Sequence, residues 1–280
     1  MKLSKVLVLL LSLCGVILAL VLAVGLILSL APAPSAYAAT VRYAKPSATG
    51  SGDCSTWANA CTLQSALGAA ASGDEIWVAE GTHTPGTLRT DTFQLKSGVG
   101  VYGGFGGTET ARSQRDWAAH PTVLSGEIGA AGNGDNAYHV VTGSGTDASA
   151  VLDGFTVSGG NANGGYPDTY GGGMYNYGGS PTLTNVTFTG NDANLRGGGM
   201  CNEDSSPVLT GTQFISNTAD YGGGMYNENS SPTLVNVVFS GNEAGVDGGN
   251  GGGWPTTQAA ARGLPSSPSS ATPPTIAAAG

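Results

Sequence analysis

The chain has 280 residues, of which 47 are glycine and only 10% are charged, and its formal net charge at pH 7 is -9. The length is enough for one substantial domain, whereas the few charged residues and many glycines suit a thin, repetitive β chain better than a bulky globular core. The lysines and arginines form no basic cluster, which excludes a nucleic-acid-binding surface.

Residues 1–38 are predicted to be an export signal peptide. Lys2 and Lys5 give it a positive start, residues 6–30 are uncharged and mostly apolar, and an Ala-Tyr-Ala segment at 36–38 is a small-x-small cleavage site. The apolar run is long enough to span a bilayer, so an uncleaved anchor is the competing interpretation, and we expect membrane contact only through this segment. The rest of the chain is expected to be extracellular or at the cell surface.

Cys54 and Cys61 are predicted to form a local disulfide, because thiols oxidise in an exported chain. The alternative is a pair of buried free thiols. Neither a histidine nor a second cysteine pair accompanies them, so the spacing does not suit a metal site. Cys201 is expected to be a free thiol in an apolar stack.

A short amphipathic helix is predicted over 62–71, where four apolar positions share one face and Thr62 or Ser65 can cap the first turn. We expect this helix to cover the open first turn of the fold, whose edge would otherwise invite aggregation. Glu75–Ala79 is predicted to be the first strand, with Ile76 and Val78 on one face.

Irregular turns and loops are predicted between about residues 80 and 170. Arg115 and Asp116 are interpreted as a loop ion pair and Asp153 as a corner residue, while His139 is expected to be a packed or surface histidine. The charged groups available for chemistry collect in this stretch: Glu109, Arg112, Arg115, Asp116, Glu127, Asp135, His139 and Asp153.

Residues 171–247 contain regular repeats with a period of 26 and then 25 residues. Gly-Gly-Gly-Met-x-Asn begins at Gly171, Gly197 and Gly222 and is followed at matched offsets by Ser-Pro, Leu, Phe and Asn. A fixed period of this size is typical of a solenoid, in which each unit buries its apolar face by stacking on its neighbours. Alternating polarity over 182–188 predicts a half-buried strand, and the triple glycines disfavour helices.

The predicted fold class is therefore all-β: a right-handed parallel β-helix over 39–254 that begins with the capping helix at 62–71. Equal offsets predict an interior phenylalanine column of Phe188, Phe214 and Phe239. Asparagine is a poor strand former, so two asparagine columns are expected at corners, in left-handed backbone, with their amides hydrogen-bonded into ladders. They are Asn176, Asn202 and Asn227, and Asn191, Asn217 and Asn242. The alternative is that these amides line a sugar- or ion-binding groove.

Residues 255–280 turn abruptly into Ala, Pro and Ser and are expected to be disordered. The repeat requires Met after Gly253, yet Trp254 stands there, and a neighbouring reading frame can restore the methionine. Two interpretations are open: a frameshifted product of a gene that encodes further repeats, and a genuine linker.

The repeat also carries a family resemblance. Its Gly-Gly-Gly-Met-Tyr-Asn, Ser-Pro-Thr-Leu and Val-Thr-Phe-Thr-Gly-Asn runs resemble those of bacterial surface and secreted β-helix proteins with the pectin-lyase-like fold. They are similar, more loosely, to the polymorphic outer-membrane protein repeat. The resemblance covers about residues 40–254 and is more specific for fold than for activity.

The leading function is a secreted or cell-surface β-helix protein, non-catalytic, with a structural, adhesive or glycan-contacting role and with extracellular polysaccharide or other surface components as partners. The alternative is a polysaccharide lyase or glycoside hydrolase, for which the resemblance implies acidic clusters, with calcium in the lyases. The chain has no repeated aspartate column and its acidic residues look scattered, so no catalytic, cofactor or metal site is predicted. A third interpretation is a repeat passenger of a larger surface protein.

Overall fold

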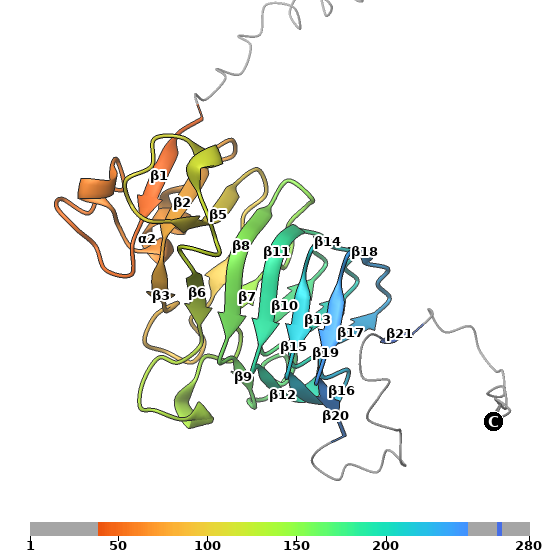
Figure 1. Ribbon diagram of the computed structural model, residues 1–280. Coiled ribbons are helices and arrows are strands. Elements are labelled where there is room, and N and C mark those ends of the chain that lie inside the picture. Colours follow the sequence, from red (N-terminus) through yellow and green to blue (C-terminus); the bar gives the residue numbers. More distant parts are fainter. Residues whose placement is uncertain (1–38, 246–261, 265–280) are drawn as a thin grey trace, which may run out of the picture. The chain divides into compact units, whose positions relative to one another are not determined.

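A computed structural model describes residues 39–245 and 262–264, which form a parallel β-helix (Figure 1). Every strand pair among these residues is parallel, and the strands make three sheets. Sheet A holds β1 (Val41–Ala44), β2 (Glu75–Ala79), β3 (Gly81–His83), β5 (Gly100–Phe105), β6 (Thr122–Ser125), β8 (Val151–Ser158), β11 (Thr182–Thr189), β14 (Val208–Thr210), β15 (Gln213–Ile215), β18 (Thr233–Val235) and β19 (Val238–Ser240). Sheet B holds β4 (Phe93–Gln94), β7 (Val141–Thr142), β10 (Met174–Tyr177), β13 (Met200–Glu203), β17 (Met225–Glu228) and β21 (Arg262–Leu264). Sheet C holds β9 (Asn161–Ala162), β12 (Asp192–Arg196), β16 (Thr218–Tyr221) and β20 (Glu243–Ala244).

From β8 onward each rung of the helix visits sheet A, then sheet C, then sheet B. Equivalent repeat residues pair across the rungs, so Met174 lies beside Met200 and Met200 beside Met225. The predicted signal peptide, the frameshift and most of the predicted disordered tail fall outside the described residues. Within that tail, Arg262–Leu264 form β21, which pairs with β17 in sheet B.

The interior is a set of side-chain columns. The rings of Phe188 and Phe214 stack with centroids 5.0 Å apart, and those of Phe214 and Phe239 with centroids 4.9 Å apart. The alternation predicted for β11 is interrupted at Asn185, because Leu183 is buried and burial then resumes at Val186 and Phe188. Each fully buried phenylalanine stabilises the fold by roughly 1.5–3 kcal/mol.

The triple glycines are required where sheet C turns into sheet B. Gly197 has φ +65°, in the left-handed region that glycine occupies most easily. A Cβ atom on Gly198 would lie 2.2 Å from the carbonyl oxygen of Thr218 in the next rung. Only glycine permits this close approach of backbones, which explains why the motif returns in every repeat.

One asparagine ladder runs along the corner between sheets A and C. Asn191 donates through Nδ2 to Asn217 Oδ1 at 2.9 Å, and Asn217 donates in the same way to Asn242 at 2.9 Å. Each amide also donates to the main-chain carbonyl of the preceding rung, at Val157, Phe188 and Phe214 respectively. The ladder therefore satisfies buried backbone as well as itself.

The second ladder lies inside sheet B rather than at a corner. Asn176 donates to Asn202 and Asn202 to Asn227, each at 2.8 Å, from within strands β10, β13 and β17. The expectation of left-handed backbone was wrong for both ladders. Positive φ is found instead at other asparagines, such as Asn185 within β11 and Asn236 between β18 and β19.

The N-terminal end differs from the predicted order of strands. Glu75–Ala79 is not the first strand of sheet A, because β1 pairs with it in parallel. The helix α2 (Leu63–Ala69) lies between them in the sequence, packs against β1, β2 and β4, and is capped by the Thr62 hydroxyl, which accepts from the Ser65 N–H at 3.2 Å. The 3-10 helices are η1 (Trp57–Asn59), η2 (Arg112–Gln114) and η3 (Asn133–Asp135).

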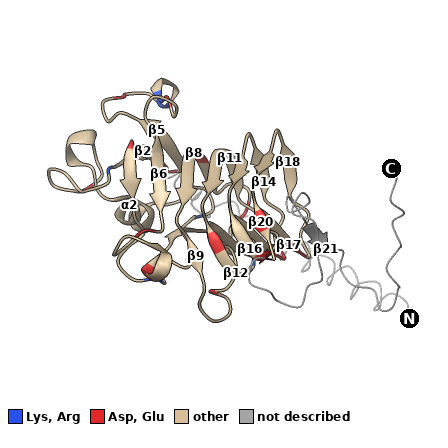
Figure 2. Ribbon diagram, turned by 60° about the horizontal axis from the view of Figure 1, so that its bottom comes forward, with Lys and Arg blue, Asp and Glu red and all other residues tan. Residues whose placement is uncertain are grey.

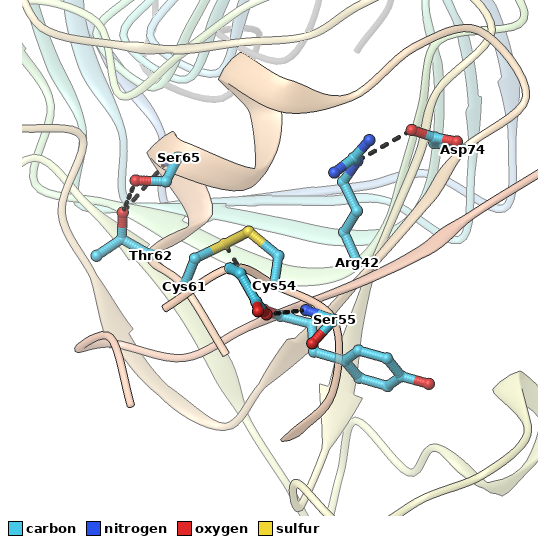
Figure 3. Close-up of a disulfide and its surroundings, with 9 residues drawn as sticks. Arg42, Cys54, Ser55, Cys61, Thr62, Ser65 and Asp74 are labelled. Atoms are coloured by element: carbon cyan, nitrogen blue, oxygen red, sulfur yellow. Dashed lines mark hydrogen bonds and ion pairs between the residues drawn. A yellow bond between two sulfur atoms is a disulfide. The ribbon is translucent and has the colours of Figure 1, made fainter. Parts of the chain in front are cut away.

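A buried carboxylate fastens β1 to the turn before β2 (Figure 3). Asp74 accepts hydrogen bonds from the Thr40 N–H, the Ala71 N–H and the Arg42 guanidinium, each at 3.0 Å. Burial raises the pKa of this carboxyl, but the three donors outweigh it and the net direction is downward. Asp74 is therefore ionised at neutral pH.

A non-repeating contact joins distant parts of the first rungs. Arg89 donates to the carbonyl oxygens of Asn136 at 2.7 Å and Asn161 at 3.0 Å, and to Asn163 Oδ1 at 2.6 Å. Its guanidinium also lies over the ring of Tyr138, 4.2 Å from the centroid.

Within residues 39–245 and 262–264, no helix has the length and apolar character needed to cross a bilayer.

The predicted disulfide between Cys54 and Cys61 is present, beside α2 (Figure 3). Replacing both cysteines by alanine is expected to lower the free energy of unfolding by about 2 kcal/mol, because the bond closes only a short loop of the unfolded chain. Urea denaturation measures the change, and reduction of the unmutated protein should reproduce it. Alkylation of both thiols in the exported protein without reductant would contradict the prediction.

Candidate functional site

The candidate site lies on the outer face of sheet B, where strands β10, β13 and β17 are stacked. Because side chains alternate along a strand, Met and Asn of the repeat point inward and the two residues beside the asparagine point outward. This arrangement builds two outer columns. The first is Tyr175, Cys201 and Tyr226, and the second is Tyr177, Glu203 and Glu228.

The second column, Arg196 and the segment before β10 line an open pocket of about 280 Å³. Its lining combines aromatic rings, carboxylates, one guanidinium and one amide. The lining residues are Tyr166, Tyr170, Tyr177, Arg196, Glu203, Asp204, Glu228 and Asn229. Tyr166 and Tyr177 are the most open of the rings, at 69% and 53% exposed.

Cys201 stands between two tyrosines in the first column and is buried. It takes the place that tyrosine has in the rungs on either side, and the guanidinium of Arg196 lies over the neighbouring ring of Tyr226, 4.8 Å from its centroid. The same guanidinium is 5.1 Å from the ring of Tyr170. Burial raises the pKa of the Cys201 thiol, so it remains protonated at neutral pH.

Charged groups are paired at the base of the pocket. Arg196 forms an ion pair with Glu228, and its Nη1 is 3.6 Å from Glu203 Oε1. The Tyr175 hydroxyl donates to Glu203 Oε2 at 2.7 Å. Burial, followed by the Glu203 carboxylate, raises the pKa of Tyr175, so this phenol is a hydrogen-bond donor throughout the neutral range.

His139 packs behind this network and is buried, as one of the two interpretations of the sequence had it. Its ring stacks on Tyr175 with centroids 5.2 Å apart, and Nδ1 lies 3.1 Å from the Gly171 carbonyl oxygen. Nε2 is 3.4 Å from Asp168 Oδ1. Burial lowers the pKa of His139, which holds the imidazole neutral at pH 7.

Two interpretations of charged residues from the sequence were wrong. Arg115 pairs with Asp153 at 2.5 Å and not with Asp116. Asp153 is a nearly buried member of strand β8, not a corner residue, and a buried carboxylate needs such a counter-charge. Asp116 instead accepts from the N–H groups of Ala118 and Ala119, which forms a local turn.

The carboxylates of the pocket were not predicted from the sequence. Glu203 and Glu228 are not scattered, because they lie at the same place in consecutive rungs. The signal was available in the residue that follows each Met-x-Asn, which reads Tyr177, Glu203 and Glu228. Because the first repeat has tyrosine at this position, only two of the three repeats are acidic there, and the column was not recognised as a repeated acidic position.

The described part of the chain, 39–245 with 262–264, contains no group of three or more His, Cys, Asp or Glu side chains placed to hold a metal ion. The arrangement on sheet B is instead one of aromatic faces beside hydrogen-bonding groups. It can bind a small polar ring or a cation without a metal.

No protein-family model and no curated protein matches the chain. Among solved structures, it is similar to pectate lyase Pel9A, with a TM-score of 0.45 and 16% sequence identity. The match covers 74% of this chain and 48% of the lyase, so this chain spans about half the length of that protein.

Proposed function

We propose that this protein is an exported, non-catalytic β-helix protein that contacts glycans through the tyrosine-lined pocket on sheet B. The observation that supports this function is the pairing of the exposed rings of Tyr166 and Tyr177 with carboxylates in one pocket. An aromatic face packs on the apolar face of a sugar ring, while a few placed polar groups bind the hydroxyls. The volume of about 280 Å³ is near the small end of ligand pockets and suits one sugar residue at a time.

Export is the second part of the proposal. The Cys54–Cys61 disulfide is of a kind that persists in oxidising compartments and is rare in the cytosol. The positive, apolar segment at 1–38 supports the same conclusion from the sequence. An extracellular or cell-surface location gives a glycan-contacting pocket its ligands.

The engagement of the charged groups supports a non-catalytic role. A glycoside hydrolase of the usual kind needs one carboxyl as acid and another as base or nucleophile, both facing the scissile bond. Here Glu203 is held by Tyr175 and Arg196, and Glu228 is held by Arg196. Arg196 is itself committed to these two carboxylates and to two tyrosine rings, so it is not free to act as a base.

The test is a glycan-binding measurement on the exported protein with immobilised polysaccharides. Tyr177→Ala and Tyr166→Ala are each expected to weaken binding roughly tenfold, the loss of one aromatic contact of about 1.4 kcal/mol. Tyr221→Ala is the matched control, because Tyr221 is 48% exposed on β16 and does not line the pocket.

Equal weakening by all three substitutions, or binding that none of them changes, would contradict the assignment of the pocket. Incubation with pectate and alginate in the presence of calcium tests the non-catalytic part. Release of unsaturated products by the unmutated protein would show a polysaccharide lyase instead.

A further inference from the structure

We infer that the pocket on sheet B binds a protonated amine, so that the glycans it selects are amino sugars whose amine is free. This inference rests on the proposed function and names the class of sugar that the pocket takes. It follows from three observations: the negative charge of the surrounding chain, the ion pairs that already engage Arg196, and the exposed carboxylate of Asp204.

Arg196 is the sole lysine or arginine between residues 116 and 245. The same stretch contains twelve acidic residues, which are Asp116, Glu127, Asp135, Asp147, Asp153, Asp168, Asp192, Glu203, Asp204, Asp220, Glu228 and Glu243. Figure 2 shows acidic positions on β12 and β20, the sheet C strands of the same rungs. Such a field concentrates cations at the surface and repels anionic polymers such as uronates.

Inside the pocket, the single guanidinium does not balance the acids. Glu203, Asp204 and Glu228 carry three negative charges against the one positive charge of Arg196. Arg196 already faces Glu203 and Glu228 and lies over two tyrosine rings, so it cannot turn toward an anionic ligand without breaking these contacts. The pocket therefore has an excess of negative charge, which a cationic ligand would offset.

Asp204 is the carboxylate available to bind such a cation. Its side chain is exposed and has no hydrogen-bond or ion-pair partner among the described residues. Its backbone has φ +49°, at a corner where Gly178 stands one rung earlier with φ +60° and Asn229 one rung later with φ +49°. Because Asp204 lines the pocket and its side chain is exposed, its carboxylate is accessible to a ligand there.

The open tyrosine rings add a second attraction for the same charge. An ammonium over the face of a tyrosine is stabilised by the ring quadrupole. Tyr166 and Tyr177 offer two such faces in the pocket that also contains Asp204. A divalent metal suits this lining poorly, because calcium needs six or more converging oxygens and the described residues bring no three metal-binding side chains together.

The experiment is calorimetric titration of the exported protein at mildly acidic pH with three tetrasaccharides: glucosamine, N-acetylglucosamine and galacturonic acid. We expect the glucosamine tetramer to bind at least about tenfold more tightly than the N-acetylated one, and the galacturonate tetramer to bind most weakly. The preference should shrink when salt is raised from about 0.05 M to about 0.5 M, because the charges lie in an open pocket.

Asp204→Asn should remove most of the preference for the glucosamine tetramer, so that its affinity falls close to that of the N-acetylated tetramer. Asp204→Gly should have the same effect on binding without loss of thermal stability, because glycine favours this φ. Asp220→Asn is the matched control, since it removes the same charge on β16 from a residue outside the pocket.

The outcomes separate this inference from the proposed function. If the N-acetylated or galacturonate tetramer binds as tightly as glucosamine, or if Asp220→Asn acts like Asp204→Asn, the inference is overturned while glycan binding stands. If no tetrasaccharide binds, the proposed function fails with it. If a tetralysine peptide binds as tightly as the glucosamine tetramer, the pocket selects charge without a sugar, which also overturns the inference.

Discussion

Replacing Asn217 by alanine is expected to lower the free energy of unfolding by about 4 kcal/mol, a large part of the stability of a typical domain. Its Oδ1 accepts from the main-chain N–H and the side-chain amide of Asn191 at 3.1 and 2.9 Å. Its Nδ2 donates to the Phe188 carbonyl and to Asn242, both at 2.9 Å. Alanine leaves several buried polar groups without partners, and each such group costs about 1–3 kcal/mol.

Equilibrium denaturation in urea measures this loss. Asn236→Gly is the matched control, because Asn236 is an exposed asparagine with φ +53° that belongs to neither ladder. Glycine occupies that backbone region readily, so the control should change the stability by less than about 1 kcal/mol. Similar effects of the two substitutions would refute a special energetic role for the ladder.

Phe214→Ala is expected to cost about 4 kcal/mol through the loss of the central ring of the phenylalanine column. Phe214 is fully buried and stacks on a ring from the rung on each side. The surrounding backbone is fixed by three parallel sheets and cannot collapse into the space, so the cavity remains.

Phe239→Ala gives the comparison within the same column. Phe239 is half-buried and has a stacked ring on one side among the described residues, so its removal should cost less than half as much. Thermal or urea unfolding of the two variants provides the ratio. Equal losses at both positions would mean that stacking along the axis contributes little and that burial of one face is sufficient.

The repeats allowed the core to be predicted well from the sequence. Equal offsets from the triple glycine predict that Phe188 and Phe214 lie one above the other, and polar alternation predicts strand β11. The parallel β-helix follows from the same periodicity. Local features were harder, since β1 is a four-residue strand without a repeat to mark it. The positive φ of Asn185 lies within β11, where the alternating pattern gives no sign of it.

The pocket was not predictable because it depends on residues outside the period. Tyr166 and Tyr170 come from a segment without a counterpart in the later repeats. Arg196 lies over the ring of Tyr226 in the next rung, whereas its own rung has Cys201 in place of tyrosine. The pairing of Arg115 with Asp153 is equally non-periodic, since it joins an irregular loop to a strand 38 residues later. Periodicity specifies stacking in this chain, and departures from periodicity specify the site.

The contacts of Arg89 affect the register in which the rungs pair during folding. The repeats at Gly171, Gly197 and Gly222 are nearly interchangeable, so a pairing that skips one whole rung would satisfy the same amides and the same rings. Arg89 has no equivalent in those repeats and ties the segments around Asn136 and Asn161 to one position. We expect Arg89 to fix the register of the first rungs, so that the later rungs add in the correct order. Without it, kinetically trapped chains with shifted rung pairing should accumulate during folding.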